Sequence, residues 1–260
     1  MSRQPVLFVS HGAPTFALEP GRAGALLRAL GERLPLPQAI LVVSPHWMTH
    51  GLAVTASARP ETLHDFGGFP AELYALRYRA PGDPARAARI ARLLGEAGRS
   101  VTLDERRGLD HGAWVPLRHL YPRAQVPVLQ LSMPVRLDAP SAWRLGEMLA
   151  PLRDEGVLVI ASGGLTHNLY EFRSGAEEAG YAREFVAWAR RAVLDHDRDA
   201  LVDYLRRAPH ARRAHPTPDH YLPLLVAAGA GGPDAPIEVL DGGMTHGVLS
   251  MESYLFGQIG

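Results

Sequence analysis

The chain of 260 residues contains no cysteine and no lysine. Without thiols it can form no disulfide, no iron–sulfur cluster and no cysteine-ligated zinc site, and it has no thiolate nucleophile. Without lysine it has no Schiff-base or lysine-base chemistry. Any metal ion must therefore be held by histidine, aspartate or glutamate.

Excess charge of one sign and long apolar runs are missing as well. The 27 basic residues balance 27 acidic ones, so the composition indicates neither a nucleic-acid partner nor an acidic membrane partner. No apolar run approaches the roughly 18–20 residues that span a bilayer. The first expected strand begins at residue 6, which leaves no room for a signal peptide, and we expect a cytoplasmic protein. The oligomeric state stays open, because no heptad pattern is visible.

Several well-known catalytic motifs are also absent. The sequence has no Gly-x-Gly-x-x-Gly and no P-loop, so nucleotide binding has little support. It has no Gly-x-Ser-x-Gly elbow, and Ser10, Ser44 and Ser162 are expected to end strands rather than to act as nucleophiles. It has no His-Glu-x-x-His helix either, so a metal site would have to be assembled from separate parts of the chain.

Three short apolar runs each lead into a small-residue turn that carries a histidine. The runs 6–10, 39–44 and 157–162 are followed by His11, His46 and His167. Nearly continuous Val, Ile and Leu is typical of parallel strands that are covered on both faces. Ligands of open α/β sheets bind outside the carboxyl ends of such strands. Three imidazoles at that edge therefore indicate a metal site.

Strands alternating with helices predict an α/β fold. We expect a single domain, 1–260, with a central, mostly parallel β-sheet and helices on both faces. Further strands are expected at 52–55, 126–132 and 237–240, and helices at 22–34, 84–97, 139–153, 181–194, 198–206 and 218–228. Thr217 is the expected N-cap of the last helix, and residues 207–216 are expected to form an exposed connector.

Two more histidines have chemistry-bearing surroundings. His111 lies on a glycine-flanked segment before an expected helix, and His220 lies in the first turn of the last one. Asp65, Asp110 and Asp219 each neighbour a histidine in the sequence, either as loop and cap carboxylates or as acceptors that orient an imidazole. The aromatic, glycine-rich segment 64–70 is either an ordinary turn or a substrate-contacting loop. Several neutral imidazoles suit zinc as well as non-haem iron.

These segments resemble the class III (LigB-type) extradiol ring-cleavage dioxygenases, and most closely their DODA-type branch, the 4,5-DOPA dioxygenases. The matching segments are FVSHGAPT at 8–15, SPHW at 44–47, HDFGGFP at 64–70, LDHGAW at 109–114, THNL at 166–169 and PTPDHYLPLL at 216–225. Each is short, but together they run in order along most of the chain.

The resemblance implies a divalent metal, Fe(II) or Zn(II), bound by His11, His46 and His220. It also implies that His111 and His167 lie in the pocket, one of them as acid/base, with His167 either in that role or as a fourth ligand. The substrates would be O₂ and a catechol-type ring. We expect Trp47 and Trp114, with the 64–70 loop, to wall off that ring.

Two other functions remain open at this point. A zinc-dependent hydrolase of the same fold would use a metal-bound water as its nucleophile. A metal-binding or interaction protein could have kept the fold without catalysis. The all-histidine ligand set is compatible with both, because zinc binds imidazoles as readily as iron does.

Overall fold

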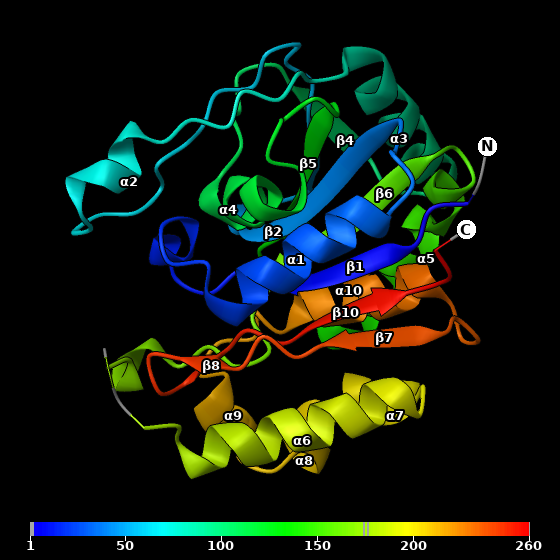
Figure 1. Ribbon diagram of the computed structural model, residues 1–260. Helices are drawn as coiled ribbons and strands as arrows, with labels where there is room; N and C mark the ends of the chain where they lie inside the picture. Colours follow the sequence, from blue (N-terminus) through cyan, green and yellow to red (C-terminus); the bar gives the residue numbers. More distant parts are fainter. Residues whose placement is uncertain (1–2, 174, 176, 260) are drawn as a thin grey trace.

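An eight-stranded sheet forms the centre of the computed structural model, which describes residues 3–173, 175 and 177–259 (Figure 1). The strands lie in the order β4-β3-β5-β2-β6-β1-β10-β7. Their bounds are β1 Val6–Ser10, β2 Ala39–Thr49, β3 Leu52–Thr55, β4 Val101–Asp104, β5 Val128–Pro134, β6 Val157–Gly163, β7 Ile237–Leu240 and β10 Ser253–Phe256. A separate pair is formed by β8 Met244–Thr245 and β9 Leu249–Ser250.

The four central strands run parallel. β2 pairs in parallel with both β5 and β6, and β6 pairs in parallel with β1. The direction reverses on both sides of this group, because β3 is antiparallel to β5 and β10 is antiparallel to β1. The expected α/β fold with a mostly parallel sheet is confirmed. The carboxyl ends of the four parallel strands therefore meet at one edge.

Helices cover both faces of the sheet. Alternate residues of each strand point to opposite faces, so Phe8 joins the hydrophobic cluster of the helices at 139–149 and 222–231, while Leu7 joins that of the helices at 21–33 and 111–120. The helices are α1 Gly21–Arg33, α2 Ala71–Ala75, α3 Pro84–Glu96, α4 His111–Leu120, α5 Ala139–Leu149, α6 Gly180–Leu194, α7 Arg198–Val202, α8 Tyr204–Arg207, α9 Ala211–Ala214 and α10 Leu222–Gly231. Short 3₁₀ turns lie at Pro14–Ala17, Ala150–Arg153 and Leu169–Glu171. Along the part of the chain that the structure covers, no helix is long and apolar enough to cross a membrane.

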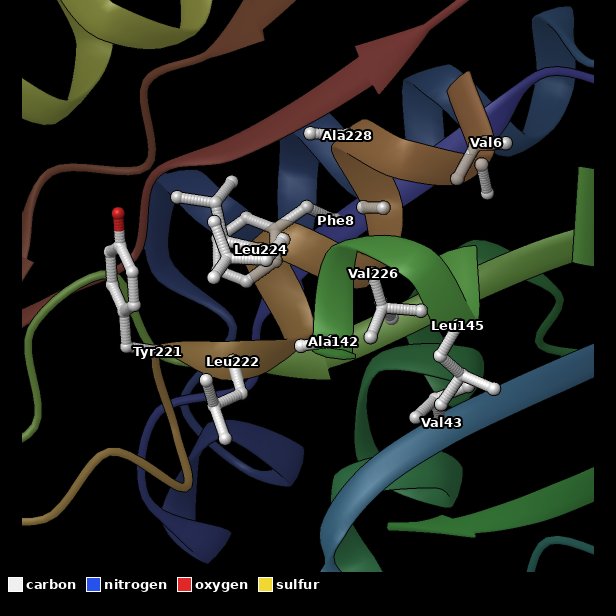
Figure 2. Packing of buried hydrophobic residues seen from close by; sticks show 14 of the residues in the cluster. Val6, Phe8, Val43, Ala142, Leu145, Tyr221, Leu222, Leu224, Val226 and Ala228 are labelled. Carbon is white, nitrogen blue, oxygen red and sulfur yellow. The ribbon is translucent and has the colours of Figure 1, made fainter. Parts of the chain in front are cut away.

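Helix α10 is buried along its whole length between the sheet and α5 (Figure 2). It begins at Leu222, so the prediction of a helix from 218 with Thr217 as N-cap is wrong. Proline explains the late start. Pro223 fits the first turn, but in a helix begun at 218 its ring would meet the carbonyl group of Asp219. His220 therefore lies in the turn before the helix rather than inside it.

Two other boundaries differ from the expectations. β2 continues to Thr49, with a shift of register between Val43 and Met48, so His46 lies in an irregular stretch of the strand and not in a turn after it. Pro45 has no N–H to give to the ladder, which accounts for the irregularity. The expected exposed connector 207–216 instead contains α9, and His215 at its end is buried.

Candidate metal centre

Five histidines from separate elements meet at the carboxyl edge of the parallel strands. His11 follows β1, His46 lies in β2, and His111 is the first residue of α4. His167 follows β6, and His220 lies in the turn that leads into α10. All five line one cavity or pack directly against the histidines that do, which is where the topology of the sheet predicts a ligand site.

The rings are close enough to share one ion. Nε2 of His11 lies 3.1 Å from Nε2 of His46, and His11, His46 and His111 each offer a nitrogen within 4.8 Å of the others. The centre of the His220 ring lies 5.2 Å from that of His11 and 5.1 Å from that of His46. The ring of His167 stacks on His220 at 3.4 Å. The tightest group of three thus contains His111, with His220 beside it.

Hydrogen bonds determine which nitrogen of His11 faces the centre. The hydroxyl group of Ser162 donates to the carbonyl group of Gly112 at 2.5 Å, so its oxygen accepts the Nδ1–H of His11 at 2.9 Å. The lone pair of His11 Nε2 is then directed at His46. Two facing imidazole lone pairs repel each other unless a proton or a cation lies between them.

Two carboxylates orient two further rings in the same way. Asp65 accepts from both the backbone N–H and Nδ1 of His111, each at 2.9 Å. Asp219 accepts from Nδ1 of His220 at 2.6 Å. Nε2 of His220 is buried and has no hydrogen-bond partner among the residues that the structure covers. A buried nitrogen without a partner is costly, and a metal ion would satisfy it.

The protonation of these groups suits a cation. Burial, and then the neighbouring imidazoles, hold the pKa values of His11 and His46 well below the usual range. Burial also lowers the pKa of His167, and that of His220 despite its bond to Asp219. Burial opposes ionisation of Asp219, but the hydrogen bond from His220 keeps its pKa low. At neutral pH the rings of His11, His46, His167 and His220 are therefore neutral and the Asp219 carboxylate is ionised, which is the state that binds metal.

Backbone contacts with the end of β6 hold His220 against the sheet. The N–H of Gly164 donates to the carbonyl oxygen of His220 at 3.0 Å. A Cβ atom on Gly163 would lie 2.4 Å from the same oxygen, so this approach requires glycine. The Gly-Gly turn after β6 thus positions His220, in addition to carrying His167.

Asp110 does not orient an imidazole, unlike its two counterparts. It is fully buried and accepts hydrogen bonds from Ser44 at 3.0 Å and from Gln130 at 2.7 Å, and burial raises its pKa. The Arg107 guanidinium lies 3.5 Å from the same carboxylate and donates to the carbonyl group of His46. This network braces the irregular stretch of β2. These contacts support a structural role for the Asp110 carboxylate.

The histidines open into a cavity of about 480 Å³. Its walls are mainly apolar and come from the turn after β1, the 64–70 loop, the 3₁₀ turn after His167 and the segment before α10. The residues that line it are Gly12, Ala13, Pro14, His46, Phe66, Phe69, His111, His167, Leu169, Tyr170, Phe172, Pro216, Thr217, Asp219, His220 and Leu249.

The walls of this cavity agree with only part of the expectation. Phe66 and Phe69 line it, so the 64–70 loop takes part in the site. Trp114 is fully buried beneath Phe66, with its Nε1 donating to the carbonyl group of Leu63. Trp47 packs against the Arg107 guanidinium at 5.4 Å. Neither tryptophan is among the residues that line the cavity, so their expected role as ring walls is wrong.

A mixed α/β sheet carries convergent histidines at its carboxyl edge, an arrangement that can hold a metal ion, and sequence comparison identifies the class of enzyme. The family model described as the catalytic LigB subunit of aromatic ring-opening dioxygenase matches residues 7–257. The chain therefore belongs to the LigB family, and it is an extradiol aromatic ring-opening dioxygenase, an oxidoreductase.

Curated relatives and a solved structure agree with this assignment. A protein of Beta vulgaris named 4,5-DOPA dioxygenase extradiol is 41% identical over 96% of this chain and 95% of its own length. A protein of the same name from Escherichia coli K12 is 42% identical over 98% of this chain and 96% of its own. The crystal structure of an uncharacterized protein from Escherichia coli K12 superimposes with a TM-score of 0.81, at 36% identity, over 98% of this chain and all of that one.

Proposed function

We propose that the chain acts as one catalytic domain, 1–260, that opens catechol rings with Fe(II) bound by His11, His46 and His220. The observation that carries the proposal is the buried Nε2 of His220, which has no hydrogen-bond partner among the described residues, on a ring whose centre lies 5.2 and 5.1 Å from those of His11 and His46. The DOPA dioxygenase names of the relatives support a catechol as substrate.

The overall reaction balances without an external reductant. A catechol and one O₂ give a ring-opened product that carries a carboxylic acid and an aldehyde. The carbon–carbon bond beside the diol breaks, both oxygen atoms enter the product, the ring loses four electrons and O₂ gains them. When bound, Fe(II) supplies the one-electron steps that allow O₂ to react with a closed-shell ring.

His111 has the geometry of a general base. Its Nδ1–H donates to Asp65, so Nε2 carries the lone pair of a ring that lines the cavity. It can take a proton from a catechol hydroxyl and later return it to the departing oxygen. Asp65 stabilises the imidazolium that forms, as a carboxylate beside an imidazole does in other acid/base catalysts. His167, which stacks on His220 and also lines the cavity, takes the second proton.

The direct test is anaerobic loading with Fe(II), followed by a catechol and O₂. We expect a yellow semialdehyde absorbance and consumption of one O₂ per ring. Elemental analysis of protein expressed without added metal identifies the resident ion. Absence of ring opening with iron demonstrably bound would contradict the proposal. Zinc retention together with ester or amide hydrolysis would favour the zinc hydrolase instead.

Alanine variants separate ligands from acid/base groups. His11→Ala, His46→Ala and His220→Ala should each lose bound metal. His111→Ala and His167→Ala should keep the metal and lose at least about 100-fold in kcat, which is the usual size of an acid/base contribution. His196→Ala, at an exposed position after α6, is the matched control and should change neither the metal content nor kcat. If His111→Ala loses its metal, His111 would be the metal ligand and His220 the acid/base group.

A further inference from the structure

The rings of His167 and His220 are stacked, although they come from different segments of the chain. The ring centres lie 3.4 Å apart and the ring planes differ by only 5°. His167 follows β6, whereas His220 lies between α9 and α10. A hydrogen bond from the N–H of Gly164 to the carbonyl oxygen of His220 joins the two segments on one side of the rings. A second set of hydrogen bonds joins residues 165–168 to residues 213–215.

His215, directly after α9, makes the first of these contacts. Its Nε2 lies 2.9 Å from the carbonyl oxygen of Leu165, which can only accept, so Nε2 carries the proton. Nδ1 then carries a lone pair, and this buried atom has no hydrogen-bond partner among the described residues. A buried polar atom without a partner costs stability, and an apolar side chain would avoid that cost. Packing alone therefore does not account for a histidine at this position, whereas the bond to Leu165 does.

Asn168 makes the second contact. Its Oδ1 accepts from the backbone N–H of Tyr170 at 3.1 Å, which fixes the orientation of the amide group. Nδ2 then donates to the carbonyl oxygen of Arg213 at 2.8 Å. The Asn168 side chain is almost fully buried, so this bond is made away from water, where a hydrogen bond is electrostatically stronger.

A backbone hydrogen bond lies between the two side-chain contacts. The N–H of His167 donates to the carbonyl oxygen of Ala214 at 2.8 Å. We call these three hydrogen bonds the tether. The chain from the tether to His220 is short and contains Pro216 and Pro218, whose rings restrict the backbone. The tether therefore fixes the place of His220 as well as that of His167.

We propose that His215 and Asn168 are positioning residues, which hold the ring of His167 parallel to that of His220. Neither is among the residues that line the cavity, so both act through the backbone of the segments that carry the two rings. The inference rests on the proposed acid/base role of His167 and extends it to side chains outside the cavity.

Two substitutions of His215 separate the hydrogen bond from the packing. His215→Leu removes the donor and should lower kcat at least about tenfold with unchanged KM and metal content, because a misplacement of about 1 Å can cost about 100-fold in rate. His215→Gln keeps an N–H donor near the place of Nε2 and should retain kcat within about twofold. His50→Leu, at an exposed position after β2, is the matched control and should leave kcat unchanged. Equal kcat values for the two His215 variants would overturn the inference.

Asn168→Asp tests the second contact and does not require His215→Leu to fold. An aspartate still accepts from Tyr170 but cannot donate to the carbonyl group of Arg213, so kcat should fall at least about tenfold. Glu171→Gln breaks a solvent-accessible ion pair with Arg213 and should leave kcat unchanged. An Asn168→Asp variant with full kcat would show that Asn168 is not a positioning residue.

A double-mutant cycle shows whether His215 acts through His167. In a His167→Ala background, His215→Leu should lower kcat by no more than about twofold further, since the ring that it positions is gone. If the two losses multiply instead, His215 affects the reaction by another route and the inference is wrong.

Hydrogen exchange tests the tether without turnover. In metal-free protein, the backbone N–H of His167 should exchange at least about tenfold faster in His215→Leu than in His215→Gln. The N–H of Leu109, which donates to the carbonyl group of Glu61, should exchange equally in both. Equal acceleration at the two sites would indicate a general loss of stability and contradict the inference. A fully active His167→Ala, with the expected exchange pattern, would contradict the proposed acid/base role of His167 and leave the tether in place.

Discussion

At the scale of single residues, the centre depends on which way each imidazole is turned. Ser162 orients His11, Asp65 orients His111 and Asp219 orients His220, each by accepting the Nδ1–H. The Nε2 lone pairs are thereby directed inward before any ion arrives. The two carboxylates have the same chemical role toward different rings, so their removal should have different consequences.

Asp219→Asn should weaken metal binding by about 10–100-fold, because an amide polarises the His220 ring less than a carboxylate does. Competition with a chelator, followed by elemental analysis, measures this affinity. Asp234→Asn, at an exposed position before β7, is the matched control. Unchanged metal affinity in Asp219→Asn would show that His220 is not a ligand.

Asp65→Asn should keep the metal and lose about 10–100-fold in kcat, with little change in KM. The asparagine side chain can still accept from the backbone N–H of His111, but it no longer stabilises an imidazolium. Steady-state kinetics and metal content, measured on the same sample, check both halves of the prediction. A variant that loses its metal instead would place His111 among the ligands.

At the scale of elements, the position of His220 depends on how α10 packs. Helices α5 and α10 approach until their backbones touch. A Cβ atom on Gly146 would lie 2.1 Å from the carbonyl oxygen of Val226, and one on Gly229 would lie 2.2 Å from that of Trp143. Glycine is therefore required on both sides of this contact. Because α10 is held in this way, the position of the preceding turn, which carries His220, is fixed as well.

Gly146→Ala should destabilise the protein by about 1–3 kcal/mol, because the added methyl group pushes two packed helices apart. Gly95→Ala provides the contrast. Gly95 also lies in a helix, α3, but none of the described residues comes within 4 Å of the added methyl group, so the substitution should stabilise the protein by about 0.5–1 kcal/mol. Urea unfolding of both variants measures the difference. If the two variants have the same free energy of unfolding, moving α5 and α10 apart costs no stability.

At the scale of the whole molecule, folding buries imidazoles in their neutral form. Burial holds the pKa values of His11, His46 and His220 below the usual 6.5, and lowers that of His215 to about 4. Below pH 6.5 the unfolded chain binds protons at these positions, whereas the folded protein does not. The free energy of unfolding must therefore fall as the pH falls below that value.

Metal-free protein should be clearly less stable at pH 5.5 than at pH 7.5. Each imidazole that stays neutral in the folded state contributes up to about 1.4 kcal/mol per pH unit below 6.5. Urea unfolding at the two pH values measures the change. An excess of zinc should steepen the loss, since metal binds only deprotonated rings. A protein that is equally stable at both pH values would show that these histidines are protonated when folded.

The sequence by itself determined the α/β class and the place of the site. The apolar runs before His11, His46 and His167 are typical of buried parallel strands, and parallel strands present their carboxyl ends together. The predicted bounds of β1, β3 and β7 agree with the structure, since each is marked by local residues. The strand-end pattern could not identify His111 and His220. Their surroundings marked them as candidates, and the family resemblance assigned their roles.

Only the tertiary structure decided how these residues work together. Asp65 and His111 are 46 positions apart and Ser162 and Gly112 are 50, so no local pattern predicts that they share hydrogen bonds. The predicted start of α10 at residue 218 was wrong, because the position of Pro223 outweighs the capping preference of Thr217. Nor does the sequence show that, among the described residues, no arginine lines the cavity. Composition counts charged side chains, but only packing decides which of them reach the site.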